Sequence, residues 1–360
     1  MSETGDQYAQ VSNVEVEVGG KKIEETDLAA FQVDMQLSEP DMATIRLKNT
    51  GHKYSNGGVD HADPVKIKVN DKEIFIGEVV GIEPVYMSGG ASTCTIRAFN
   101  RLHRLLRGRF SQTFKDMSDQ DVAKKIATSC GLSAKCGSTP KITHEHIYQH
   151  NQTHLEFLRT RAKRLGFDVW VHDKDLYFDA PKTDKDSGIE LVMKDPTAAN
   201  LLFKFRPRLT SVSSVEKVVV HGWDPIKKEA IVGEAKAASS KLGKDGADKA
   251  GKKFGTAISY EVDHPVTTVE EAKAIATAKL ADLLMRFVTA EGLAKGNPDL
   301  KAGIVVKVTV NPDKADDTFN GKYLLEGVTH TYTHTKPGAE GGGGGYKCAI
   351  RGCRDAEKGT

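Results

Sequence analysis

Apolar and polar residues alternate along much of the chain, a spacing that is typical of strands with one buried face. The pattern is clear in five segments of the first hundred residues: Val14–Val18, Phe31–Met35, Ala43–Leu47, Val65–Val69 and Cys94–Arg97. A longer segment, Ile74–Tyr86, ends in an aromatic residue and is followed by a glycine turn. Together these segments predict a β-barrel at the start of the chain.

The end of the chain repeats this arrangement. Val306–Asn311 alternates as Val65–Asn70 does, and Cys348-Ala-Ile-Arg351 matches Cys94-Thr-Ile-Arg97. In the second copy the long strand is Tyr323–Thr335, and the glycine turn is Gly341–Gly345. Each motif alone is short enough to arise by chance, but the shared order and spacing favour duplication. Two similar barrels suit the building of a ring better than the building of a pocket.

Three segments between the copies have helical spacing instead. Ser118 and Asp121 begin a helix with Val122, Ile126 and Cys130 on one face, and Gly131 is placed to end it. Thr153 and Glu156 form a full capping box before a helix that stops at Gly166. Strands at Phe167–Val171 and Leu176–Phe178 follow this helix. Thr268 caps a third helix, apolar at Ala272, Ile275, Ala276, Leu280 and Leu283.

The predicted fold class is therefore a mixed, β-rich α+β fold with two homologous tube-type β-barrels and an inserted α/β subdomain. We assign residues 1–105 to the first barrel, 106–200 to the inserted subdomain, and 201–230 with 256–360 to the second barrel and its helix. Residues 231–255 are assigned to a flexible excursion. The segment from Ala235 to Gly255 is rich in Ala, Lys, Gly and Ser and has too little apolar surface to offset its ordering entropy.

Composition narrows the classes of partner. The 360 residues imply two to three domains, and the polar start lacks the apolar region of a signal peptide. No apolar run approaches membrane-spanning length, so we expect no membrane anchor. With 51 basic against 49 acidic residues, there is no overall field to attract nucleic acid. Five cysteines without a CxxC pair do not predict disulfides, and Cys94 and Cys348 are expected to pack as small apolar groups.

Clusters of histidine, aspartate, glycine and arginine are the candidates for metal or anion sites. His144, His146, His150 and His154 cluster, but Ile147 stands where a HExxH motif needs Glu, so solvated loop histidines are expected. His330 and His334 share one face of a strand, where a polar barrel face is expected. The sets that remain are better explained as structural: a hairpin tip at Asp313, Asp316, Asp317 and Gly321, a flexible hairpin at Gly341–Gly345, and a connector at Arg101–Arg109 with Leu102, Leu105 and Leu106 packed inward.

Glu156 invites a general-acid role, but its place in the capping box already explains it, and no second carboxylate is identifiable near it. Neither a GxSxG elbow nor a Cys–His arrangement is recognisable. We therefore predict no catalytic, cofactor-binding or metal-binding residues, no cofactor, and no enzymatic activity.

From Arg101 to Phe178 the chain resembles the phage late control protein D family, the baseplate hub of contractile phage tails and related injection systems. The resemblance rests on Arg-Leu-His-Arg-Leu at 101–105, Ser-Asp-Gln-Asp at 118–121 and Asn-Gln-Thr-His-Leu-Glu-Phe-Leu at 151–158. The turn Val220–Pro225 and the strand Gly321–His330 also resemble that family. The family is in turn similar to the N-terminal hub part of type VI valine-glycine repeat spike proteins. These motifs are structural, and none is catalytic.

The resemblance implies a homotrimer whose two barrels per chain make a pseudo-sixfold ring between a sixfold tail tube and a threefold spike. Because Thr360 directly follows the second barrel, we expect a separate spike protein as partner, with a tube or tube-initiator protein and other baseplate proteins. Assembly in the bacterial cytoplasm and residence in a tail or injection-system baseplate are expected. The alternatives are a baseplate-associated peptidoglycan hydrolase and the hub portion of a type VI-like spike. The sequence leaves open whether the machine is a phage, a tailocin or an extracellular injection system.

Overall fold

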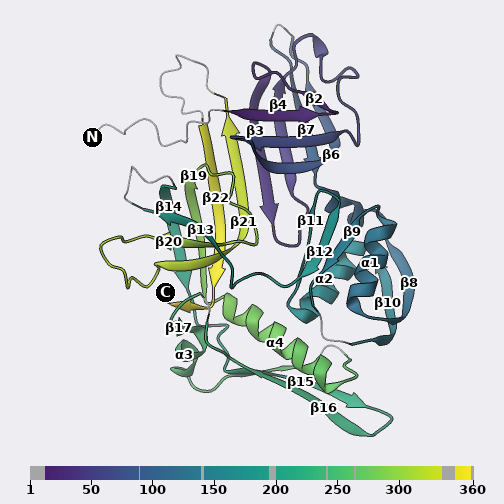
Figure 1. Ribbon diagram of the computed structural model, residues 1–360, viewed down its shortest axis with the longest axis vertical. Helices are drawn as coiled ribbons and strands as arrows, with labels where there is room; N and C mark the ends of the chain where they lie inside the picture. Colours follow the sequence, from purple (N-terminus) through teal and green to yellow (C-terminus); the bar gives the residue numbers. More distant parts are fainter. Residues whose placement is uncertain are drawn as a thin grey trace.

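A computed structural model describes residues 13–88, 90–138, 142–193, 200–240, 242–262, 265–334 and 345–357. One 13-stranded sheet runs through two units of the chain, and a subdomain with its own core lies beside it (Figure 1). In Figure 1 the first unit is purple to blue and the second is teal to yellow. The predicted β-rich α+β class is confirmed.

Unit 1 contains six main strands: β1 (Val14–Val18), β3 (Leu28–Gln36), β4 (Met42–Lys48), β5 (Pro64–Val69), β6 (Lys72–Val85) and β7 (Thr93–Phe99). The short strand β2 (Lys21–Lys22) and the 3-10 turn η1 (Thr50–His52) accompany them. Alternate residues of each strand face the core, and Ile45, Ile67 and Ile96 are fully buried there. Their spatial order is β1-β5-β6-β7-β4-β3.

Unit 2 also contains six main strands: β13 (Asp186–Val192), β14 (Leu202–Leu209), β19 (Val288–Lys295), β20 (Val305–Thr309), β21 (Gly321–Thr333) and β22 (Gly345–Arg354). Their spatial order, β13-β20-β21-β22-β19-β14, places the first to sixth strands of unit 2 where their counterparts lie in unit 1. One pairing differs, because β1 lies antiparallel to β5 whereas β13 lies parallel to β20.

The strand register repeats as well. Val65 pairs with Gly77 in unit 1, and the matching Val306 pairs with Tyr323 in unit 2. Further along, a bulge precedes Gly81, which pairs with Arg97, and an equivalent bulge precedes Gly327, which pairs with Arg351. The repeat read from the sequence is therefore a repeat of topology, register and irregularity.

In the described ranges the two barrel-like units are curled sheets that are joined edge to edge. The first half of β21 pairs with β20, but its second half, Gly327–Thr333, pairs with β3 of unit 1. Because β21 is long enough to carry a different neighbour along each half, the two curled sheets merge into one.

The inserted subdomain follows β7. It begins with η2 (Arg101–Leu106) and contains β8 (Phe110–Met117), α1 (Asp119–Ser129), β9 (Ser133–Cys136), β10 (His144–Gln152), α2 (His154–Leu165), β11 (Asp168–His172) and β12 (Asp175–Asp179). Strands β10 and β8 form one small sheet, and β11, β12 and β9 form another. Leu102 and Leu105 are buried as expected, but Leu106 is 44% exposed, so its inward packing was wrongly predicted.

A second insertion lies between β14 and β19. It contains β15 (Lys217–Asp224), β16 (Glu229–Lys236), β17 (Asp245–Gly246), α3 (Ala247–Lys252), β18 (Ile258–Glu261) and α4 (Val269–Met285); β17 pairs with β23 (Ala356–Glu357). Helix α4 lies along β15 and β16 (Figure 1). A Cβ at Gly233 would come within 2.3 Å of the Ala272 backbone, so glycine allows this close packing.

Residues 231–255, which were assigned to a flexible excursion, contain regular elements. Strand β16 extends to Lys236, and β17 and α3 follow it. The segment has few apolar side chains, but Leu242 and Ala247 are almost completely buried. Average composition does not reveal this burial, because it depends on which positions are apolar. The mobility of the segment stays a prediction.

Candidate assembly sites

The junction between the two units is a continuous antiparallel ladder. Seven residue pairs join β21 to β3, from Gly327 with Gln36 to Thr333 with Ala30. Its inward side chains are buried: Val328, His330 and Tyr332 from β21, and Phe31, Val33 and Met35 from β3. The Phe31 and Tyr332 rings stack with centroids 5.2 Å apart. On the opposite face, the Thr329 hydroxyl donates to the Asp34 carboxylate at 2.8 Å.

A polar cluster lies inside this junction. His330 is fully buried; its Nδ1 lies 2.5 Å from the Tyr346 hydroxyl and its Nε2 lies 2.9 Å from the Leu300 carbonyl oxygen. Burial lowers the pKa of His330 to about 4, which keeps the imidazole neutral at ordinary pH. The expectation of a polar barrel face is therefore wrong for His330, because its ring faces inward, between Tyr346 and the Leu300 carbonyl.

The Cys348 sulfur lies 3.3 Å from the same imidazole nitrogen, a Cys–His contact that the sequence analysis missed. Burial raises the pKa of the Cys348 thiol to about 12, so the reactive thiolate is suppressed. Cys348 and Cys94 are both completely buried, which confirms their predicted packing role. The cluster is built as a core rather than as a nucleophilic site.

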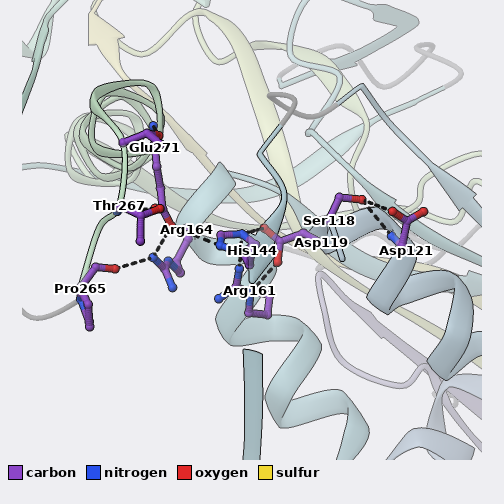
Figure 2. Close-up of polar contacts among 10 residues, drawn as sticks. Ser118, Asp119, Asp121, His144, Arg161, Arg164, Pro265, Thr267 and Glu271 are labelled. Atoms are coloured by element: carbon purple, nitrogen blue, oxygen red, sulfur yellow. Dashed lines mark hydrogen bonds and ion pairs between the residues drawn. The ribbon is translucent and has the colours of Figure 1, made fainter. Parts of the chain in front are cut away.

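A second polar joint holds the inserted subdomain against α4 (Figure 2). The Arg161 guanidinium donates to Asp119 at the start of α1 and to Nε2 of His144 in β10, the latter at 2.8 Å. Arg164, one turn further along α2, donates to Glu271 of α4 at 2.8 Å. Glu271 also accepts the Thr267 backbone N–H at 3.0 Å.

In this joint the cost of burying each charge is offset by an oppositely charged or hydrogen-bonding neighbour. Asp119, Arg161 and Glu271 are each less than a tenth exposed. Burial would raise the pKa of Asp119, but the neighbouring His144 and Arg161 lower it below its ordinary value. Buried charges of this kind are tolerated because each has a partner. The joint therefore fixes how the subdomain meets unit 2.

Solvated loop histidines were expected at these four positions; His146 and His150 are indeed exposed, but they lie on a strand, and His144 and His154 are largely covered. His144, His146 and His150 lie on β10, and His144 belongs to the polar joint. His154 is buried at the start of α2, where its ring stacks on Phe110 with centroids 4.1 Å apart. Across the described ranges, no three His, Cys, Asp or Glu residues are grouped so as to hold a metal ion.

Glu156 occupies the capping position predicted for it. Its carboxylate accepts the Thr153 backbone N–H at 2.9 Å, and its own N–H donates to the Thr153 hydroxyl at 3.1 Å. Arg109 forms an ion pair with the same carboxylate at 3.4 Å. The acidic set at 313–317 lies in the loop between β20 and β21, as the hairpin-tip prediction has it. The glycine run lies outside the described residues except for Gly345, which begins β22.

Two open strand edges of the large sheet lie at equivalent ends of the repeated units. Within the described ranges, residues 80–85 of β6 pair only with β7, and β14 pairs only with β19. These edges end the antiparallel run β14-β19-β22-β21-β3-β4-β7-β6. Apolar side chains beside them are solvent-exposed, including Val85, Tyr86 and Leu209.

A third open surface lies on the small sheet formed by β16, β15 and β18. Helix α4 covers one face of it, and Trp223 and Tyr260 are 59% and 64% exposed. The His221 and Tyr260 rings stack with centroids 5.8 Å apart. Exposed aromatic residues gathered in this way mark interaction surfaces more often than they mark ordinary protein surface. None of the described helices is both long and apolar enough to cross a membrane.

Several solved structures have a similar fold. The chain is similar to the 43 kDa tail protein of prophage MuSo2 from Shewanella oneidensis, at 13% identity, a TM-score of 0.68, and coverage of 96% of this chain and 99% of that one. The tail protein from Neisseria meningitidis MC58 matches at 14% identity and a TM-score of 0.67, with 95% and 96% of the two chains covered.

A third match is the E. coli c3393 protein, described as a component of the type VI secretion system with structural similarity to the T4 tail proteins gp27 and gp5. It shares 12% identity and a TM-score of 0.62, with 94% of this chain and 76% of that chain covered. The resemblance to phage baseplate hubs drawn from the sequence is confirmed in the fold. A search of curated proteins finds no match. Residues 65–334, most of the chain, match the model of the Alg8 N-terminal domain, so the chain belongs to the Alg8 N-terminal domain family.

Proposed function

We propose that this chain is a structural hub of a contractile tail or injection system. In this account three copies form a ring of six similar units, which joins a sixfold tail tube to a threefold spike. The observation that carries the proposal is the repeat of strand order and register in units 1 and 2. A chain that contains two equivalent units can meet a sixfold partner while it assembles with threefold symmetry.

The fold supports the tail-related part of this proposal. The solved structures of similar fold include two described as tail proteins and one described as a type VI secretion component. The joined units supply rigidity, because the β21–β3 ladder fixes one unit on the other. The open β6 and β14 edges offer contacts to further copies. The exposed aromatic face around Trp223 and Tyr260 offers a surface for a separate spike, tube or other baseplate protein.

Native mass spectrometry tests the ring. A complex of three chains, each of 39.1 kDa, is expected from the purified hub or from hub bound to its spike partner. A chain that stays monomeric inside assembled particles would contradict the proposal.

A baseplate-borne peptidoglycan hydrolase is the enzymatic alternative. The capping and ion-pair contacts of Glu156 account for this residue without catalysis. Zymography separates the two functions: we expect no clearing of cell wall by the purified wild-type chain. Clearing by wild type that is lost in Glu156→Ala would favour the hydrolase.

A further inference from the structure

The open edges of β6 and β14 are the counterparts of the two edges that meet inside the chain. The shared register makes Ile82, Pro84 and Tyr86 the equivalents of Val328, His330 and Tyr332 in β21. The ladders through Ile96 and Ile350 likewise make Phe205, Pro207 and Leu209 of β14 the equivalents of Phe31, Val33 and Met35 in β3.

Burial differs sharply between these matched sets. At the internal junction all six inward side chains are at most 9% exposed. Their counterparts are all more open: Tyr86 is 60% exposed, Leu209 is 38% exposed, and the other four are half-buried. Apolar side chains that are buried at one end of a repeat and open at the other indicate that a matching strand is missing.

We propose that the β6 edge of one copy docks on the β14 edge of a second copy, in the register of the internal junction. This inference rests on the proposed ring and names the surface that closes it. The register pairs Ile82 with Leu209, Pro84 with Pro207 and Tyr86 with Phe205 of the second copy. The last pair is the counterpart of the stacked Tyr332 and Phe31 rings.

Strand direction and charge agree with this docking. Every neighbouring pair in the run from β14 to β6 is antiparallel, so an antiparallel β6–β14 contact continues the alternation from copy to copy. On the opposite face, the register places Glu83 against Arg208, the position held by Thr329 and Asp34 inside the chain. Opposite charges across a strand pair are favourable.

The two prolines make the outer contact different from the inner one. Hydrogen bonds join His334 to Ala29 and Leu37 to Glu326 at the ends of the inner ladder. Since bonded pairs recur at every second residue, His330 and Val33 form such a pair in the middle. At the outer edges Pro84 is the equivalent of His330 and Pro207 is the equivalent of Val33, and proline has no backbone N–H to donate. The outer contact therefore lacks the two central hydrogen bonds of the inner ladder and depends more on its side chains. The same prolines make each edge less able to pair with other strands before assembly.

Disulfide trapping tests the register. Val85 and Arg206 lie on the opposite face from the aromatic pair and become a non-hydrogen-bonded pair, whose Cα atoms are about 4.5 Å apart. That separation permits a disulfide. The pair Val85→Cys with Arg206→Cys is made in a Cys130→Ser, Cys136→Ser background, since the other three cysteines are buried. Val85→Cys with Lys204→Cys is the matched control, shifted by two residues on the same face.

The expected result is covalent oligomers up to trimers for the first pair, reversed by reductant, with several-fold less product for the control. Tyr86→Ala should also weaken association about tenfold, equivalent to about 1.4 kcal/mol. Trimers in native mass spectrometry without preferential trapping of Val85→Cys with Arg206→Cys would overturn the docking surface alone. Monomers inside assembled particles would overturn the ring and this inference together.

Discussion

The second halves of β6 and β21 occupy equivalent places in the two units but face different neighbours. In unit 2, β3 covers this half-strand, and the position of His330 can hold a buried imidazole bonded to Tyr346. In unit 1 the edge is open, and Pro84 occupies the equivalent position. The two units therefore share one topology, but the residue types in this half-strand differ with its neighbour: a buried polar residue where β3 is paired, and proline where the edge is open.

The comparison indicates how one sequence repeat can serve two kinds of contact. A permanent contact within a chain tolerates buried polar groups, because each group gains its hydrogen-bond partner when the chain folds. An edge that stays in water until assembly needs side chains that do not promote wrong pairing, and proline meets that need.

Truncating the matched aromatic residues should affect the two regions unequally. Phe31→Ala removes a fully buried ring and should lower the free energy of unfolding by about 3–5 kcal/mol. Phe205→Ala should cost the monomer less, since that ring is only partly buried, against Tyr323. Urea unfolding of both variants measures the difference. Equal losses would break the distinction between the inner junction and the outer edge.

The polar joint provides a contrast with the apolar junction. Glu271→Ala leaves the partly buried Arg164 without its carboxylate and should lower the free energy of unfolding by about 3 kcal/mol. Glu270→Ala, in the same turn but exposed, is the control and should change stability by less than about 0.5 kcal/mol. Chemical denaturation compares them, and similar values for the two variants would show that the joint is not needed.

The buried imidazole predicts a pH dependence that unit 1 lacks at the matching site. Because the folded-state pKa of His330 is about 4, below the unfolded value of 6.5, the unfolded chain binds a proton first as pH falls. Its contribution is complete above pH 6.5 and is lost progressively toward pH 4, by roughly 3 kcal/mol at most. His330→Gln should remove this part of the slope when stability is measured by denaturation between pH 7 and 4. Identical slopes for the variant and wild type would refute the assignment.

Replacing the edge prolines should make the outer contact more like the inner one. Pro84→Val with Pro207→Val restores two backbone donors, and two hydrogen bonds contribute about 1–3 kcal/mol in total. Association should therefore become about tenfold tighter, as measured by analytical ultracentrifugation. Single replacements, which restore one donor each, should give intermediate values. Unchanged or weaker association in the double variant would show that the prolines do not face one another.

Local patterns predicted the parts of the fold that local chemistry determines. Alternation and the Cys-x-Ile-Arg motifs predicted both units. The helices also begin at the predicted capping residues, Ser118, Thr153 and Thr268. These features depend on neighbours within a few residues, so periodicity reveals them.

Contacts between distant segments were not predictable in the same way. Nothing near Phe31 specifies pairing with Tyr332, because that contact follows from which sheet edges meet. The cap at Thr268 predicts a helix start next to Glu271 but gives no sign of its partner Arg164, which lies on another helix. For His330 a signal was present: it alternates in step with Val328 and Tyr332, and this pattern points to an inward position.

A cryo-electron microscopy reconstruction of the assembled hub tests the central claim most directly. The account predicts three chains with six similar units around one axis, joined alternately by β21 with β3 inside a chain and by β6 with β14 between chains. A ring in which units 1 and 2 are not interchangeable by rotation about that axis, or an assembly without threefold symmetry, would contradict it.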